Sequence, residues 1–166
     1  AGVQTLRPCS FFFEQNSYFV TPTFGEQVSC AGDRSTCAFL PLFAGLTMRK
    51  DQLLPQLEDP ERFLTPFGVT SIDRLALSYN PNGYWNGAVW PVMQWYLWRG
   101  LLEANEPSLA REVADRILNT WQNSLTQEHY LGEHFRLEKQ SMSGAPNIAG
   151  LSASLLPMHA AYYQPC

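Results

Sequence analysis

Two segments of this sequence concentrate side chains with binding or acid–base chemistry. The first is 80–91, N-P-N-G-Y-W-N-G-A-V-W-P, which carries Tyr84, Trp85, Asn86 and Trp90 on a glycine-containing loop. Aromatic faces can stack on the apolar face of a pyranose ring, and an asparagine amide can hydrogen-bond a hydroxyl. The alternative interpretation is a loop whose aromatic side chains simply anchor it in the core.

The second segment, 126–147, is rich in carboxylates and histidines, including Glu128, His129, Glu133 and His134. One of the carboxylates could act as a general base, or the segment could be an ordinary solvated loop. A single carboxylate does not complete an inverting glycosidase site, which needs an acid and a base ~6.5–9.5 Å apart. The two histidines lack the i,i+4 spacing of a helical metal site, and no nucleotide-binding or nucleophile-elbow motif is present. We therefore predict neither a metal nor a cofactor.

The four cysteines, Cys9, Cys30, Cys37 and Cys166, form no C-x-x-C pair. Cys30 and Cys37 could close a short disulfide loop in an oxidising compartment, or both could be free thiols. Cys166 ends the chain, where it could reach another polypeptide. If the disulfide forms, the protein is expected in the secretory pathway, in a lumenal or extracellular location.

Composition excludes several classes of protein. The chain has 166 residues, of which 45 % are hydrophobic and 16 % charged, as expected for one globular domain. No apolar run reaches the ~18 residues of a transmembrane helix. The net charge is −4 and the 11 basic residues are scattered, which argues against a nucleic acid partner.

The elements that would position these side chains are helices. Apolar periodicity predicts helices over 33–47, where Pro41 would kink or delay the helix, and over 51–57. A further helix should begin at Pro91 and stop at the break 105–108, with nearly every face apolar and buried. An amphipathic helix follows over 109–125 and an apolar one over 148–163. Residues 1–32 read as irregular, 126–147 as a long loop, and the fold class as all-α.

The segment G-Y-W-N-G-A-V-W-P at 83–91 resembles the G-Y-W-R-G-P-V-W-P signature of glycoside hydrolase family 63 and its (α/α)6-barrel relatives. These include processing α-glucosidases and mannosylglycerate or glucosylglycerate hydrolases. Three more segments agree in the same order: 38–46, then 59–68, which resembles D-P-x-x-F-x-T-P-F-G, and 133–153, which is similar to the segment that carries the family's general base. Together they cover roughly residues 35–160.

The resemblance implies that 33–166 is the C-terminal part of an (α/α)6 toroid, with about five or six of its twelve helices. A second polypeptide would then complete the barrel. The implied reaction is hydrolysis of an α-glucoside or related α-glycoside with inversion, with Glu133 as the general base and Glu128 as the runner-up. Tyr84, Trp85, Asn86, Trp90 and Asn147 would contact the carbohydrate substrate. The general acid would lie upstream, because neither Asp33 nor Asp73 falls in a matching motif.

The sequence also departs from this pattern in two places. Asn86 stands where the family has arginine, and an amide cannot make the bidentate contacts of a guanidinium. The residues 148–151 replace an expected Phe-Gly-Trp pattern. These changes keep two alternatives open: an inactive glycosidase-like subunit that binds sugar or acts as a scaffold, and a purely structural helical domain.

Overall fold

The computed structural model describes residues 34–146 and 149–163. Its helical elements are η1 (Thr36–Phe39), α1 (Leu40–Phe43), α2 (Lys50–Glu58), α3 (Pro91–Glu103), α4 (Pro107–Glu128), α5 (Ala149–Ser152), η2 (Ala153–Leu155) and α6 (Leu156–Tyr163). Two antiparallel strand pairs accompany them, β1 (Leu64–Thr65) with β2 (Gly68–Val69) and β3 (His134–Arg136) with β4 (Ser141–Ser143). The mostly helical architecture confirms the all-α prediction.

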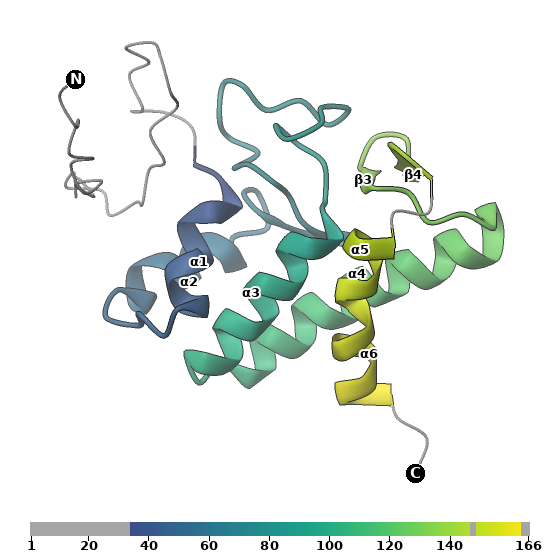
Figure 1. Ribbon diagram of the computed structural model, residues 1–166. Coiled ribbons are helices and arrows are strands. Elements are labelled where there is room, and N and C mark those ends of the chain that lie inside the picture. The colour runs from purple at the N-terminus through teal and green to yellow at the C-terminus, as the bar shows by residue number, and fades with distance from the viewer. Residues whose placement is uncertain (1–33, 147–148, 164–166) are drawn as a thin grey trace, which may run out of the picture.

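Helices α3 and α4 form the centre of the molecule as an antiparallel pair (Figure 1). Each begins with a proline in its first turn, Pro91 and Pro107, where the missing N–H has no intrahelical partner to lose. The chain reverses between them through Asn105, which has φ 60°. As predicted, α4 is amphipathic: it buries Val113 and Ile117 and turns its charged side chains outward.

Helix α3 is less evenly buried than the sequence predicts. Leu97 and Leu101 are buried, whereas Trp95 and Tyr96 are only partly covered. The covered side packs on α1 and α4, and at Gly100 an added Cβ would lie 2.7 Å from the Phe43 backbone nitrogen. The Trp95 and Tyr96 rings contact Phe43 of α1, with centroids 5.6 Å and 5.0 Å from the Phe43 ring, and stay partly exposed.

The ends of the predicted helices need correction. The helix expected over 33–47 is shorter. It is divided into η1 and α1, with Pro41 in the first turn of α1, and Gly45 at φ +76° follows the end of α1. The helix expected over 148–163 is divided into α5, η2 and α6. The helix expected over 51–57 is confirmed as α2. Residues 1–32, predicted to be irregular, lie outside the described residues.

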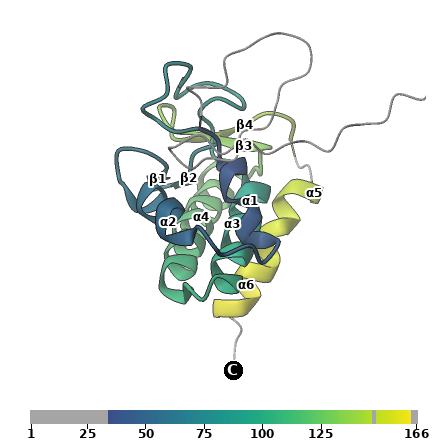
Figure 2. The same cartoon turned by 90° about the vertical axis from the view of Figure 1, so that its left-hand side faces the viewer.

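Loops and strands gather at one end of the helices (Figure 2). There Val89 joins three segments: it bridges Thr70 on one side and Phe135 on the other. Val89 and Phe135 exchange both backbone hydrogen bonds at 2.9 Å. The prediction of a long loop over 126–147 was therefore wrong, because α4 runs on to Glu128 and a β3–β4 hairpin follows. The pairing that stabilises this hairpin comes from a residue 46 positions away, which no local periodicity reveals.

Candidate active site

The centre of the candidate site is a hydrogen bond between the two predicted segments. The phenol of Tyr84 donates to Oε1 of Glu133, the residue just before β3. Oε2 of the same carboxylate accepts a longer hydrogen bond, 3.5 Å, from the backbone N–H of Ala145. The hydrogen bond to Glu133 raises the pKa of Tyr84 above its ordinary value, because it favours the protonated phenol. The pair lies at the surface, where a ligand can reach it.

Two tryptophans form a stacked pair beside Tyr84. The rings of Trp85 and Trp90 lie parallel, with an interplanar angle of 4° and centroids 3.7 Å apart. Trp90 is 1 % exposed and donates from Nε1 to the Tyr84 carbonyl at 3.0 Å, whereas Trp85 is 51 % exposed. The buried ring thus supports the open one, and the open ring can receive an apolar face.

The imidazole of His134 lies behind these aromatic side chains. It is 1 % exposed, stacks on Trp90 at 5.2 Å and meets the Tyr84 ring edge-on at 5.0 Å. Burial lowers the pKa of His134 and the Arg136 guanidinium lowers it further, against the opposing effect of Glu133. From the sequence alone, the only role considered for His134 was that of a metal ligand, which its spacing from His129 did not support. Its position directly after the predicted base was the available signal.

Gly144, on the segment after β4, makes room for the Glu133 carboxylate. A Cβ added at Gly144 would lie 2.6 Å from Oε2 of Glu133, and the residue has φ +87°, a conformation that favours glycine. Its carbonyl accepts a hydrogen bond of 2.8 Å from the Tyr130 phenol. A larger residue here would displace the carboxylate.

The other predicted site residues have different surroundings. The Asn86 amide donates to the Ser78 carbonyl at 2.9 Å, and the Asn86 backbone oxygen accepts from Asn80 at 2.8 Å, so Asn86 stabilises its own loop. Glu128 is the exposed last residue of α4, and within 34–146 and 149–163 no hydrogen bond joins it to Tyr84 or Glu133. Asn147 lies outside the described residues.

A buried glutamine connects helix α3 with strand β2. Gln94 on α3 is fully buried, and its Oε1 accepts from the Val69 N–H at 2.8 Å. Its Nε2 donates to the Val69 carbonyl at 2.8 Å and to the Trp90 carbonyl at 3.2 Å. Both backbone groups of Val69 in β2 are thereby satisfied by α3, which holds the helix and the loop that precedes it in one position.

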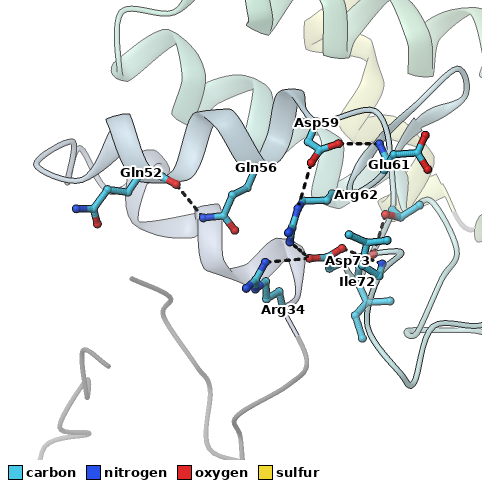
Figure 3. Close-up of polar contacts among 10 residues, drawn as sticks. Arg34, Gln52, Gln56, Asp59, Glu61, Arg62, Ile72 and Asp73 are labelled. Atoms are coloured by element: carbon cyan, nitrogen blue, oxygen red, sulfur yellow. Dashed lines mark hydrogen bonds and ion pairs between the residues drawn. The ribbon is translucent and has the colours of Figure 1, made fainter. Parts of the chain in front are cut away.

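Asp73 is a buried carboxylate with a structural environment (Figure 3). It is 2 % exposed, and its Oδ2 pairs with Arg62 at 2.7 Å and with Arg34 at 3.4 Å, while Oδ1 accepts from the Leu75 N–H at 2.9 Å. These contacts join three segments of the chain. They agree with leaving Asp73 out of the catalytic residues.

Three further observations apply to the part of the chain that the structure describes. Cys37 is a free thiol, while Cys30, its proposed partner, and Cys166 lie outside the described residues. Within the same part, no group of three or more metal-binding side chains comes together. None of its helices combines the length and the apolar character needed to cross a bilayer.

Comparison with known proteins identifies the domain. The mannosylglycerate hydrolase MGH1-like glycoside hydrolase domain matches residues 12–147. The periplasmic trehalase of Xanthomonas campestris pv. campestris (strain B100) is 30 % identical over 126 residues, which are 75 % of this chain and 20 % of that protein. The chain therefore spans about a fifth of the length of the curated relatives it matches.

Solved structures share the fold. The GH63 mannosylglycerate hydrolase from Thermus thermophilus, in complex with glucose, aligns with a TM-score of 0.61 at 23 % identity, over 78 % of this chain and 31 % of that one. Neutral trehalase from Saccharomyces cerevisiae aligns with a TM-score of 0.67 at 16 % identity, over 93 % and 28 % of the two chains. These relatives confirm the predicted resemblance, and with it the partial (α/α)6 toroid. The chain belongs to the MGH1-like glycoside hydrolase domain family, related to family 63 and to the trehalases.

Proposed function

We propose that this chain supplies the general-base part of an inverting glycoside hydrolase that acts on an α-glucoside or a related α-glycoside. The observation that carries the proposal is the contact between Tyr84 and Glu133, because it brings the two sequence motifs of the resemblance together at the surface. The half-exposed ring of Trp85 beside them offers a face for the sugar. Trp90 supports that ring, and Asn86 and Asn147 remain proposed partners of the sugar hydroxyls or of the loop.

In the proposed reaction, the Glu133 carboxylate takes a proton from a water molecule as that water attacks the anomeric carbon. The bond from this carbon to the leaving oxygen breaks in the same step, and an aspartic acid outside this chain protonates the oxygen. One displacement inverts the anomeric configuration. Tyr84 holds the carboxylate by its hydrogen bond.

The test is hydrolysis by the complete toroid, which means this chain together with the helices it lacks. Suitable substrates are trehalose and mannosylglycerate, after the names of the relatives, and glucosylglycerate, after the resemblance. Proton NMR of the first product should show the β-anomer. Glu133→Gln should lower kcat by about 10²–10⁴-fold. Glu128→Gln is the matched control and should leave kcat unchanged; the reverse pattern would identify Glu128 as the base.

A non-catalytic sugar-binding subunit is the second candidate, and Asn86 is the observation that favours it. Its amide is bonded to the Ser78 carbonyl, at a position where the resemblance predicts an arginine. Isothermal titration with the same three sugars distinguishes the candidates. Binding without any product over long incubation supports the subunit, whereas turnover that Glu133→Gln abolishes supports the hydrolase.

We also propose that the missing helices come from another polypeptide and that the assembly works outside the cytoplasm. The apolar side chains of Leu46, Met48 and Leu77 are exposed in this chain, and a partner that covers them would remove them from water. Their exposure supports the first part of the proposal. The periplasmic location named for the Xanthomonas trehalases supports the second. Co-purification followed by mass spectrometry would identify the partner, and cell fractionation would locate the assembly.

A further inference from the structure

One buried polar side chain at the site has no part in the proposed reaction. His134 lies within the protein, yet both rings that it contacts, Tyr84 and Trp90, belong to the candidate site. The Tyr84 ring is at 85° to the imidazole in an edge-on contact. The Trp90 ring is stacked on the imidazole, with an angle of 25° between the two planes. The imidazole therefore touches the residue that bonds Glu133 and the residue that supports the open tryptophan.

The nitrogen atoms of this imidazole are poorly satisfied. Nε2 accepts a long hydrogen bond, 3.4 Å, from Nε of Arg136, which leaves the proton of the neutral ring on Nδ1. Nδ1 is buried and has no hydrogen-bond partner within the described residues. An unpaired buried N–H makes histidine a poor choice for stability, since such a group loses its hydrogen bond to water and gains none in return. A residue chosen for stability alone would be apolar here, so the contacts of the ring point to a role at the site.

The backbone of His134 is held as firmly as its ring. The residue pairs with Ser143 in the β3–β4 hairpin, and the next residue, Phe135, exchanges two hydrogen bonds with Val89. Gly144 closes the other side, since a Cβ there would lie 3.0 Å from Nδ1. The imidazole therefore has little freedom to tilt, and it can transmit a fixed orientation to the Tyr84 ring.

We propose that His134 is a positioning residue that orients the phenol of Tyr84 toward the Glu133 carboxylate through ring contact. The inference rests on the proposed function only for the role of Glu133 as base, because the orientation exists without substrate. The proposal adds the buried side chain of His134 to a site whose other side chains include the exposed Tyr84 and Trp85.

The test uses the titration of Tyr84 in the 166-residue chain, followed by NMR of carbon-13-labelled tyrosine. Tyr84→Phe assigns the resonance. His134→Leu, which removes the ring, should loosen the hydrogen bond to Glu133 and so lower the raised pKa of Tyr84 toward its ordinary value. His134→Phe, which keeps a ring, should preserve the raised pKa. His159→Leu changes an exposed histidine on α6 and is the matched control, with no expected effect.

Two results would overturn the proposal: a folded His134→Leu variant that keeps the raised pKa of Tyr84, or a loss of it in both the Leu and the Phe variants. Thermal unfolding shows whether each variant is folded. If the Leu variant does not fold, nuclear Overhauser contacts between the two rings in the unaltered chain decide, and their absence contradicts the proposal. None of these measurements depends on hydrolysis, so an inactive toroid would contradict the proposed function and leave this inference standing.

Discussion

At the scale of single residues, the site divides into side chains that meet a ligand and side chains that hold them. Trp85 and Trp90 are chemically identical and stacked, yet one is half exposed and the other buried. Tyr84 and Glu133 are bonded to each other at the surface, while His134 contacts Tyr84 from within. The consequences of substitution should follow this division.

Substitution of the two tryptophans should separate binding from stability. Trp85→Ala should weaken sugar binding about tenfold, a loss of ~1.4 kcal/mol, and should change the free energy of unfolding little. Trp90→Ala should destabilise the fold by about 3–5 kcal/mol, because it removes a fully buried ring. Titration calorimetry and urea unfolding check the two effects. Equal destabilisation by both variants would show that Trp85 is a core residue.

Acid should destabilise the fold through His134. Burial above all, and then Arg136, holds the pKa of His134 below 6.5, while Glu133 acts in the opposite direction and the Tyr84 phenol is uncharged in this range. As pH falls through 6.5, the unfolded chain therefore takes up a proton before the folded one. The contribution of His134 to stability is complete above pH 6.5 and is lost as pH falls toward the lowered pKa.

Urea unfolding on either side of that value, at about pH 7.5 and about pH 5.5, measures this effect. The free energy of unfolding should be smaller at the lower pH, and His134→Phe should reduce the difference. An unchanged difference in that variant would assign the pH dependence to other groups.

At the scale of elements, the site depends on contacts between a helix and strands of only two or three residues. Gln94 provides the most specific of these contacts, since its amide satisfies both backbone groups of Val69. Gln94→Leu should leave those groups buried and unpaired, and should lower the free energy of unfolding by about 3 kcal/mol. Gln56→Leu, on the surface of α2, is the control and should change it by less than about 0.5 kcal/mol. Similar losses in both variants would contradict the assignment.

The sequence was sufficient for the elements whose signals are local. Pro91 marks the start of α3, and apolar spacing describes both α3 and α4. Pro107, which was assigned to the break between the two helices, instead begins α4. The motifs at 83–91 and 133–153 named Tyr84 and Glu133, which the structure brings together. The β3–β4 hairpin was missed because its stability depends on Val89, far away in the chain. The roles of Gln94 and His134 were missed because a polar side chain does not reveal its own burial.

At the scale of the whole molecule, this chain is one part of a larger barrel. It covers 31 % of the Thermus structure and 28 % of the yeast one, and it leaves Trp95 and Tyr96 partly exposed on α3. Met48, in the connection between α1 and α2, is 92 % exposed. Exposed apolar side chains of this kind are consistent with the proposed partner, which would cover them.

The purified chain should therefore not be a simple monomer. Light scattering should give a mass above 18.8 kDa, and the chain should bind a hydrophobic dye until the missing helices are added. Adding them should abolish dye binding and give a single soluble complex. A monodisperse particle of 18.8 kDa that binds no dye would contradict the proposed partner.

The bridges at Val89 have a further consequence, for the kinetics of folding. They join residues 70, 89 and 135, so the ladder that carries the site closes only after long stretches of chain have come together. Closing such loops costs entropy before any contact is gained, and high contact order slows folding. Helices α3 and α4 can form from local contacts, whereas the Tyr84–Glu133 contact joins residues 49 positions apart in the chain. During synthesis, both motifs must leave the ribosome before the site exists, so a nascent chain that ends before residue 133 can fold its central helix pair without yet containing the Tyr84–Glu133 contact.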